Sequence, residues 1–145
     1  DKNIIFIGFG GEEINLKGSF YYAHHPLFDL DKTSVINMDM IGEPFEIYNA
    51  ESADVPMIEK LNRVLSIGYG IETNQSGKSY PSDNKAFEYI SDEKGEINKK
   101  NIIATGTPDT QGIIHTRQDT PDKLNYEEIK KITKALLTYI YNEAY

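Results

Sequence analysis

Residues 3–19 read Asn3-Ile-Ile-Phe-Ile-Gly-Phe-Gly-Gly-Glu-Glu-Ile-Asn-Leu-Lys-Gly-Ser19, and this stretch decides the expected fold. Its apolar run, residues 4–9, is short, nearly continuous, and rich in β-branched and aromatic side chains. Such a run predicts a strand buried on both faces, as in the interior of a largely parallel sheet. Two glycines end the run, and a helical pattern begins near Leu16.

Glu12 and Glu13 follow the predicted strand directly. Carboxylates just past the carboxyl end of a central strand lie where open α/β sheets form their binding crevices. Acidic residues also favour the first turn of a helix, and this simpler interpretation stays open on local grounds. Gly10 and Gly11 are expected to let the backbone turn tightly beside the two acids.

Two further apolar segments, residues 34–42 and 101–105, predict buried strands, and residues 46–49 predict a short one. Helices are expected from Leu16 to His25, from Pro56 to Gly68, from Ser82, and after Asn125, where Glu128 completes a capping pair. Polar residues 77–81 and 91–100 predict loops. The alternation predicts an α/β fold with a mostly parallel mixed sheet flanked by helices.

The composition limits the function. The chain has 145 residues, enough for one domain or part of one, and 39% of them are hydrophobic, which suffices for a core. A formal charge of −8 argues against non-specific binding to nucleic acid or to an anionic membrane surface. The absence of cysteine excludes disulfides and thiolate metal ligands.

No apolar run approaches the roughly 18 residues of a membrane span. The chain begins without Met and without a signal-peptide pattern, so we expect it to be cut from something longer or processed. The compartment is not fixed by these features; we favour a secreted or cell-surface location over a cytoplasmic one.

Asp39 is the most informative single residue, because it interrupts the apolar strand predicted over residues 34–42. A carboxylate in such a strand costs several kcal/mol unless it is paired, hydrogen-bonded or bound to a metal. His115 follows two isoleucines where a loop begins. Adjacent His24 and His25 make a poor chelating pair on a helix, so we expect them to be structural.

Glu12, Glu13, Asp39 and His115 therefore share a position near the end of an apolar segment. Oxygen and imidazole ligands without cysteine suit a catalytic zinc site with open positions. A second carboxylate beside a ligand can accept the proton of a metal-activated water. From the residues alone, metal-assisted hydrolysis is one hypothesis among several. Asp83 is expected to be either a helix-cap charge or a site residue.

Four segments, in this order along the chain, resemble the co-catalytic zinc aminopeptidase family, whose members include bacterial leucine aminopeptidases, aminopeptidase Y and glutamate carboxypeptidase-like enzymes. The segments are Gly11-Glu-Glu-Ile-Asn-Leu-Lys-Gly-Ser19, Ile36-Asn-Met-Asp-Met-Ile-Gly42, Ser82-Asp83 and Ile114-His-Thr-Arg-Gln-Asp-Thr-Pro121. The final helix also resembles the ending of that family.

The resemblance implies a metal-dependent aminopeptidase that hydrolyses N-terminal peptide bonds with the help of two zinc ions. It implies that Glu12 is the general base, that Glu13 and His115 bind one zinc, and that Asp39 binds the other. It does not identify the residues that bind the side chains of the peptide substrate.

The chain departs from the family pattern in two ways. Asn84 stands where the family continues Ser-Asp with His. The His-x-Asp motif and the metal-bridging Asp that the family has upstream of the Glu-Glu strand are not in the sequence. We therefore expect residues 1–145 to be the C-terminal part of a zinc peptidase catalytic domain, without its N-terminal strands and ligands. We expect this fragment to bind zinc weakly, to be inactive alone, and to self-associate through an exposed sheet edge.

Three alternatives stay open. A glutaminyl cyclase-like enzyme would use one zinc with a similar set of ligands. A catalytically silent, peptidase-like interaction domain would have the fold without the chemistry, although it would have no need for Asp39. A calcium module is disfavoured because the acids lack the Asp-x-Asp-x-Asp-Gly ladder of a calcium loop.

Overall fold

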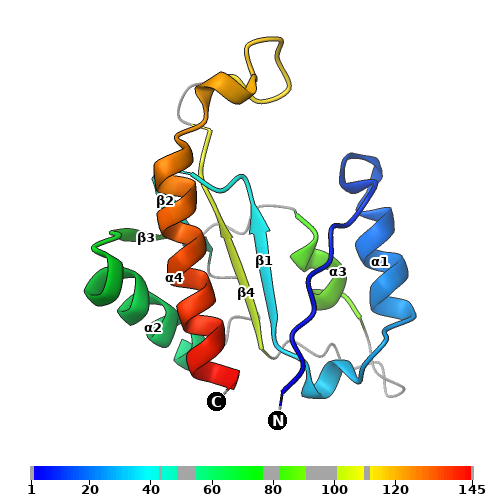
Figure 1. The fold of residues 1–145 in the computed structure, drawn as a ribbon. Helices are drawn as coiled ribbons and strands as arrows, with labels where there is room; N and C mark the ends of the chain where they lie inside the picture. Colours follow the sequence, from blue (N-terminus) through cyan, green and yellow to red (C-terminus); the bar gives the residue numbers. More distant parts are fainter. Residues whose placement is uncertain are drawn as a thin grey trace.

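A computed structural model describes residues 2–42, 44–48, 55–76, 82–90, 101–109 and 112–144. Within these residues a four-stranded sheet is flanked by helices (Figure 1). The strands are β1 (Val35–Asp39), β2 (Phe45–Tyr48), β3 (Thr73–Ser76) and β4 (Ile102–Gly106). The helices are α1 (Lys17–His24), α2 (Val55–Arg63), α3 (Asn84–Glu88) and α4 (Tyr126–Ala144).

The strand order is β1-β4-β2-β3, and the sheet is mixed. β1 and β4 are parallel, as are β2 and β3, whereas β2 and β4 are antiparallel. The predicted fold class is therefore confirmed. Because β1 and β4 run in the same direction, their carboxyl ends meet at one edge of the sheet, where Asp39 lies opposite Gly106.

Helices cover both faces of the sheet, and β4 shows how the two faces are separated. Ile103 belongs to the core that α2 and α4 form on one face, and its neighbour Ile102 belongs to the core under α1 and α3 on the other. Successive side chains of a strand point to opposite faces, so burial of all five β4 residues requires a layer of helices on each side.

The predicted helices are confirmed where the structure describes them. α1 ends at His24, before Pro26, and α2 continues into a π-helical turn over Val64–Gly68. At the start of α4, the backbone N–H of Glu128 donates to Oδ1 of Asn125 at 3.3 Å, as the capping pair predicts. Among the helices of the described residues, none is long and apolar enough to cross a membrane. The loops predicted over residues 77–81 and 91–100 lie outside the described residues.

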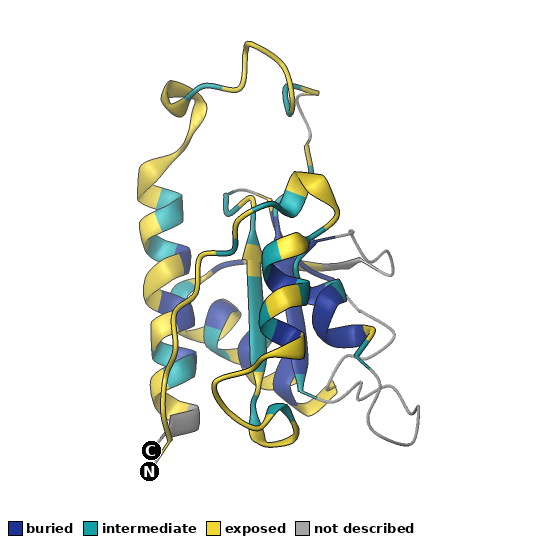
Figure 2. Cartoon of the chain, turned by 90° about the vertical axis from the view of Figure 1, so that its right-hand side faces the viewer, coloured by how far each residue is buried: buried dark blue, intermediate teal, exposed yellow. Residues whose placement is uncertain are grey.

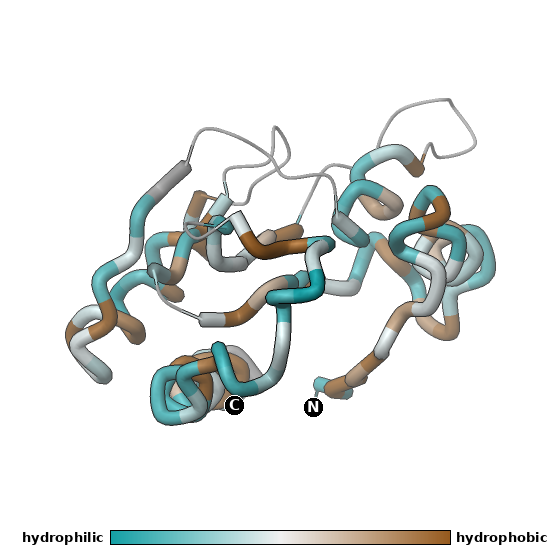
Figure 3. Tube along the Cα trace, turned by 90° about the horizontal axis from the view of Figure 1, so that it is seen from above, coloured by the Kyte–Doolittle hydropathy of each residue, from teal (hydrophilic) through white to brown (hydrophobic). Residues whose placement is uncertain are grey.

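The prediction of a buried strand over residues 4–9 is wrong. This segment is extended but has no place in the described sheet, and it runs alongside the free edge of β1 (Figure 1). Figure 3 shows it to be hydrophobic, and Figure 2 shows it exposed; Phe6 is 70% exposed. Apolar periodicity specifies a tendency to be buried, whereas a strand also needs backbone hydrogen bonds to a neighbouring strand. Among the described strands, none pairs with this segment.

β1 differs from its prediction in a related way. It is the outermost strand, so it is half-buried instead of fully buried, and Met38 is 47% exposed. The strand β3 was not predicted at all. Its sequence Thr-Asn-Gln-Ser has no apolar alternation, and only its pairing with β2 makes it a strand.

Gly106 is required by the close packing at the carboxyl end of β4. A Cβ atom there would lie 2.5 Å from the backbone oxygen of Asp39 and 3.1 Å from Cε2 of Tyr48. We therefore expect Gly106→Ala to lower the free energy of unfolding by about 1–3 kcal/mol, as overpacking does. Gly8→Ala is the control, because a Cβ atom at Gly8 meets nothing within 4 Å. Equal urea-unfolding midpoints for the two variants would show that the backbone absorbs the added methyl group.

Candidate functional site

A cleft of about 1150 Å³ lies at the carboxyl ends of β1 and β4. All four residues that the sequence singles out line it: Glu12, Glu13, Asp39 and His115. The turn after the N-terminal segment and the loop between β4 and α4 both lie at this end of the sheet (Figure 1). The rest of the lining is mixed, and its apolar part includes Met40, Ile41, Ile113, Ile114, Leu124 and Ile129.

Glu12 and Glu13 lie on a tight turn, the 3-10 helix Glu12–Ile14. Gly11 precedes it with φ 74°, a left-handed conformation that glycine adopts without steric cost, so the expected tight turn is confirmed. The N–H of Gly18 donates to the carbonyl oxygen of Gly10 at 3.0 Å. A Cβ atom at Gly18 would overlap that oxygen, so this glycine allows α1 to hold the turn closely.

His115 reaches the cleft from the loop between β4 and α4. Its Nε2 lies 3.5 Å from Oε1 of Glu13, and both side chains are largely exposed. The loop is shaped by Asp109, whose carboxylate accepts the N–H groups of Ile113 at 3.1 Å and Ile114 at 3.2 Å. His115 itself has φ 61°, an uncommon conformation for a non-glycine residue that often marks a functional site.

Asp39 is the last residue of β1 and is half-buried. Met40 follows it with φ 52°, so the chain turns sharply away from the sheet directly after this carboxylate. The described residues provide no hydrogen-bond donor or cation for the Asp39 side chain. A half-buried carboxylate without a counter-charge is poised to bind a cation.

The pKa of Glu12 is raised above its usual value. Burial is the main cause, and the negative charges of Glu13, Asp39 and Asp83 add to it, while His115 acts in the opposite direction. Three neighbouring carboxylates thus act on Glu12 at this edge of the sheet. Glu12, Glu13 and Asp39 line the cleft together with His115 and make it anionic there.

The raised pKa of Glu12 makes the stability of the folded protein depend on pH. A carboxyl group whose pKa is raised by folding stabilises the folded state fully below its unfolded pKa, and this contribution is lost as the pH rises through the folded pKa. In metal-free protein, Glu12→Gln should therefore raise the melting temperature near pH 7 and leave it unchanged near about pH 3. Glu59→Gln, which changes an exposed carboxyl group on α2, is the control. A Glu12→Gln effect of equal size at both pH values would contradict the electrostatic cause.

The fit of the cleft to a metal ion is partial. Glu13 and His115 offer one carboxylate and one imidazole close together, which are donors that zinc prefers. Within the described ranges, however, no group of three His, Cys, Asp or Glu side chains is close enough to hold one ion. Catalytic zinc usually has three protein ligands, so Glu13 and His115 make part of such a site.

Three polar residues that line or adjoin the cleft were missed as site residues. Asn37 on β1 donates from Nδ2 to Oγ of Ser82 at 3.0 Å, and the same nitrogen lies 3.5 Å from Oδ1 of Asn84. All three line the cleft, and Asn84 is fully buried. The sequence signal was available for Asn37, which interrupts the apolar run of β1 two residues before Asp39.

Asp83 does not act as a helix cap, because no side-chain cap bond forms at the start of α3. Its Oδ1 is buried and has no hydrogen-bond partner in the described part of the chain. Its charge raises the pKa of Glu12, so of its two predicted roles the structure favours that of a site residue.

The model of the peptidase family M28 matches residues 1–140. The chain belongs to peptidase family M28. A curated relative, aminopeptidase YwaD of Bacillus subtilis (strain 168), is 27% identical over 151 aligned positions, which cover 97% of the M28 chain and 32% of the relative.

Solved structures share the fold of this M28 chain. BSAP, a zinc aminopeptidase from Bacillus subtilis, superposes with a TM-score of 0.73 at 19% identity, over 94% of the chain and 34% of its own length. The aminopeptidase from Aneurinibacillus sp. strain AM-1 superposes with a TM-score of 0.69 at 21% identity, over 92% of the chain and 31% of its own length. The chain therefore spans about a third of the length of these relatives.

Proposed function

We propose that the protein containing this chain is a metal-dependent aminopeptidase that hydrolyses N-terminal peptide bonds. The observation that carries the proposal is the meeting of Glu12, Glu13, Asp39 and His115 around one cleft in a chain of peptidase family M28. The relatives described above are aminopeptidases, and BSAP is a zinc aminopeptidase. Peptides with a free N-terminus are the proposed substrates, and the anionic cleft suits their ammonium group.

The proposed role of each of the four residues follows from its place in the cleft and from its chemistry. Glu12 is the general base, because burial and then the neighbouring carboxylates raise its pKa toward the range in which a carboxylate accepts a proton effectively. Glu13 and His115 would hold one zinc ion, and Asp39 would take part in binding a second. Bound zinc supplies a Lewis acid that polarises the scissile carbonyl and lowers the pKa of water.

We further propose that residues 1–145 are the C-terminal part of the catalytic domain and are inactive alone, with weak or partial zinc occupancy. Two findings support this. The chain covers about a third of its relatives, and the described residues offer zinc no group of three ligands. Metal analysis of the purified chain, after dialysis against zinc, should give less than one zinc per chain. Tight stoichiometric zinc would contradict this proposal.

The reaction is tested with three peptides that differ only at the N-terminus: one free, one acetylated, and one beginning with Gln. The complete zinc-loaded protein should shorten the free peptide by one residue and leave the acetylated one intact, as mass spectrometry would show. Loss of ammonia from the Gln peptide without shortening would favour the glutaminyl cyclase-like alternative. No change in any peptide would favour a silent interaction domain.

Self-association through the sheet edge is also proposed. β1 pairs only with β4 among the described strands, and the neighbouring segment exposes Ile4 and Phe6. An unpaired edge beside exposed apolar side chains is a template for pairing with another chain. Sedimentation velocity should then show a mass that rises with concentration, whereas a monomer at all concentrations would contradict the proposal.

A further inference from the structure

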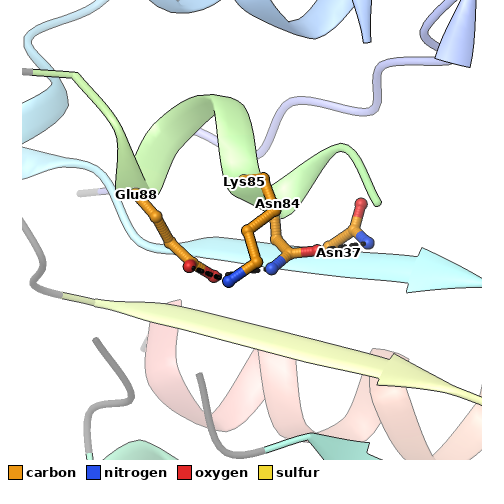
Figure 4. A network of polar contacts seen from close by, with 4 residues as sticks. All are labelled: Asn37, Asn84, Lys85 and Glu88. Atoms are coloured by element: carbon orange, nitrogen blue, oxygen red, sulfur yellow. Dashed lines mark hydrogen bonds and ion pairs between the residues drawn. The ribbon is translucent and has the colours of Figure 1, made fainter. Parts of the chain in front are cut away.

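A chain of half-buried and buried polar side chains connects α3 to β1 (Figure 4). Nζ of Lys85 lies 2.5 Å from Oε2 of Glu88, and Oε1 of Glu88 accepts from Nδ2 of Asn84 at 2.6 Å. The Lys85 and Glu88 side chains are only 16% and 6% exposed. A buried ion pair can cost stability, so its role here is sought in the way it orients the polar groups around it.

The ion pair fixes the orientation of two amide groups. A carboxylate only accepts hydrogen bonds, so Asn84 must turn its NH₂ group toward Glu88 and its Oδ1 toward β1. Nδ2 of Asn37 lies 3.5 Å from this oxygen, at the outer limit of a hydrogen bond, and 3.0 Å from Oγ of Ser82. The opposite orientation of Asn37 would place two amide oxygens against each other.

Oδ1 of Asn37 is consequently left facing away from the network. Among the described residues, this oxygen has no hydrogen-bond partner. It is not one of the buried side-chain oxygens that lack a partner in this part of the chain, so it is accessible to solvent. Asn37 lines the cleft, and it lies on the same face of β1 as Asp39 because the two are two residues apart. The cleft thus contains an oriented hydrogen-bond acceptor beside Asp39.

We propose that Asn37 is a substrate-binding residue whose Oδ1 accepts a hydrogen bond from a peptide N–H of the bound substrate. Asn84 and Glu88 are positioning residues that hold this oxygen toward the cleft. This inference rests on the proposed function and adds to it one substrate contact, which distinguishes amides from esters. A site built to bind an N–H group discriminates against a ligand that lacks it.

The test compares L-leucine N-methylamide with L-leucine methyl ester, which replaces the amide N–H with an oxygen atom. Leucine suits the apolar lining of the cleft. Binding is measured by NMR titration of the complete zinc-loaded protein in a Glu12→Gln background, which removes the proposed base so that neither ligand is consumed. We expect the amide to bind roughly three- to tenfold more tightly than the ester, and Asn37→Ala to abolish this preference.

Glu88→Gln tests the positioning role. Its amide can donate as well as accept, so Asn84 is no longer held in one orientation. We expect this variant to reduce the preference for the amide, with weaker amide binding and unchanged ester binding. If Glu88 only stabilised the fold, Glu88→Gln would weaken the binding of the amide and of the ester equally.

A second measurement needs no variant that might fail to fold. The side-chain NH₂ resonances of Asn37 should shift when the amide binds and shift less when the ester binds. Equal shifts, or an amide preference that survives in Asn37→Ala, would overturn the inference while leaving the proposed aminopeptidase intact. Failure of both ligands to bind the parent protein would overturn the proposed peptide site, and the inference with it.

Discussion

Replacing Glu12 with Gln is expected to lower kcat of the complete zinc-loaded protein by about 10²–10⁴-fold, the range of a lost general base. The physical reason is that Gln keeps the size and shape of the side chain but cannot accept a proton. Burial and the neighbouring carboxylates raise the pKa of Glu12, so its proton affinity is greater than that of an ordinary surface carboxylate. Initial rates of release of the N-terminal residue from a free peptide measure the effect.

The control for this prediction is Glu59→Gln, which makes the same chemical change at an exposed position on α2, away from the cleft. It should leave kcat within about twofold of the parent protein, since surface substitutions usually change little. Retention of more than a tenth of the activity in Glu12→Gln would show that another group takes the proton.

Replacing His115 or Glu13 with Ala is expected to weaken zinc binding by at least about 100-fold. Loss of residues that merely orient a ligand already costs 10–100-fold, so loss of a ligand should cost more. The two side chains are 3.5 Å apart, and we propose that they share one ion, so the double variant should be little worse than either single variant. Competition with a chromophoric zinc chelator measures the affinities.

His24→Ala is the matched control, because His24 is exposed at the end of α1 and does not line the cleft. Its zinc affinity should equal that of the parent chain. Additive losses in the double variant would indicate that Glu13 and His115 bind separate ions. Equal affinity of the His115→Ala and His24→Ala proteins would remove His115 from the metal site.

Much of the candidate site was predictable because its residues break a pattern. A carboxylate or imidazole at the end of an apolar segment has no reason to be there on grounds of packing, and this singled out Asp39 and His115. Both line the cleft. The contact of Asn37 with Ser82 and Asn84 was not predictable, because it joins β1 to residues at the start of α3 that are far away in the sequence.

The helices, the capping of α4, the central apolar strand β4 and the residue types at the strand ends follow from the amino-acid sequence without knowledge of the fold. These features depend on local periodicity and on side chains a few residues apart. The position of residues 4–9 outside the described sheet and the position of β1 at its edge come from the tertiary structure alone. Strand pairing and contacts across a cleft depend on which distant segments become neighbours, and no local pattern encodes that choice.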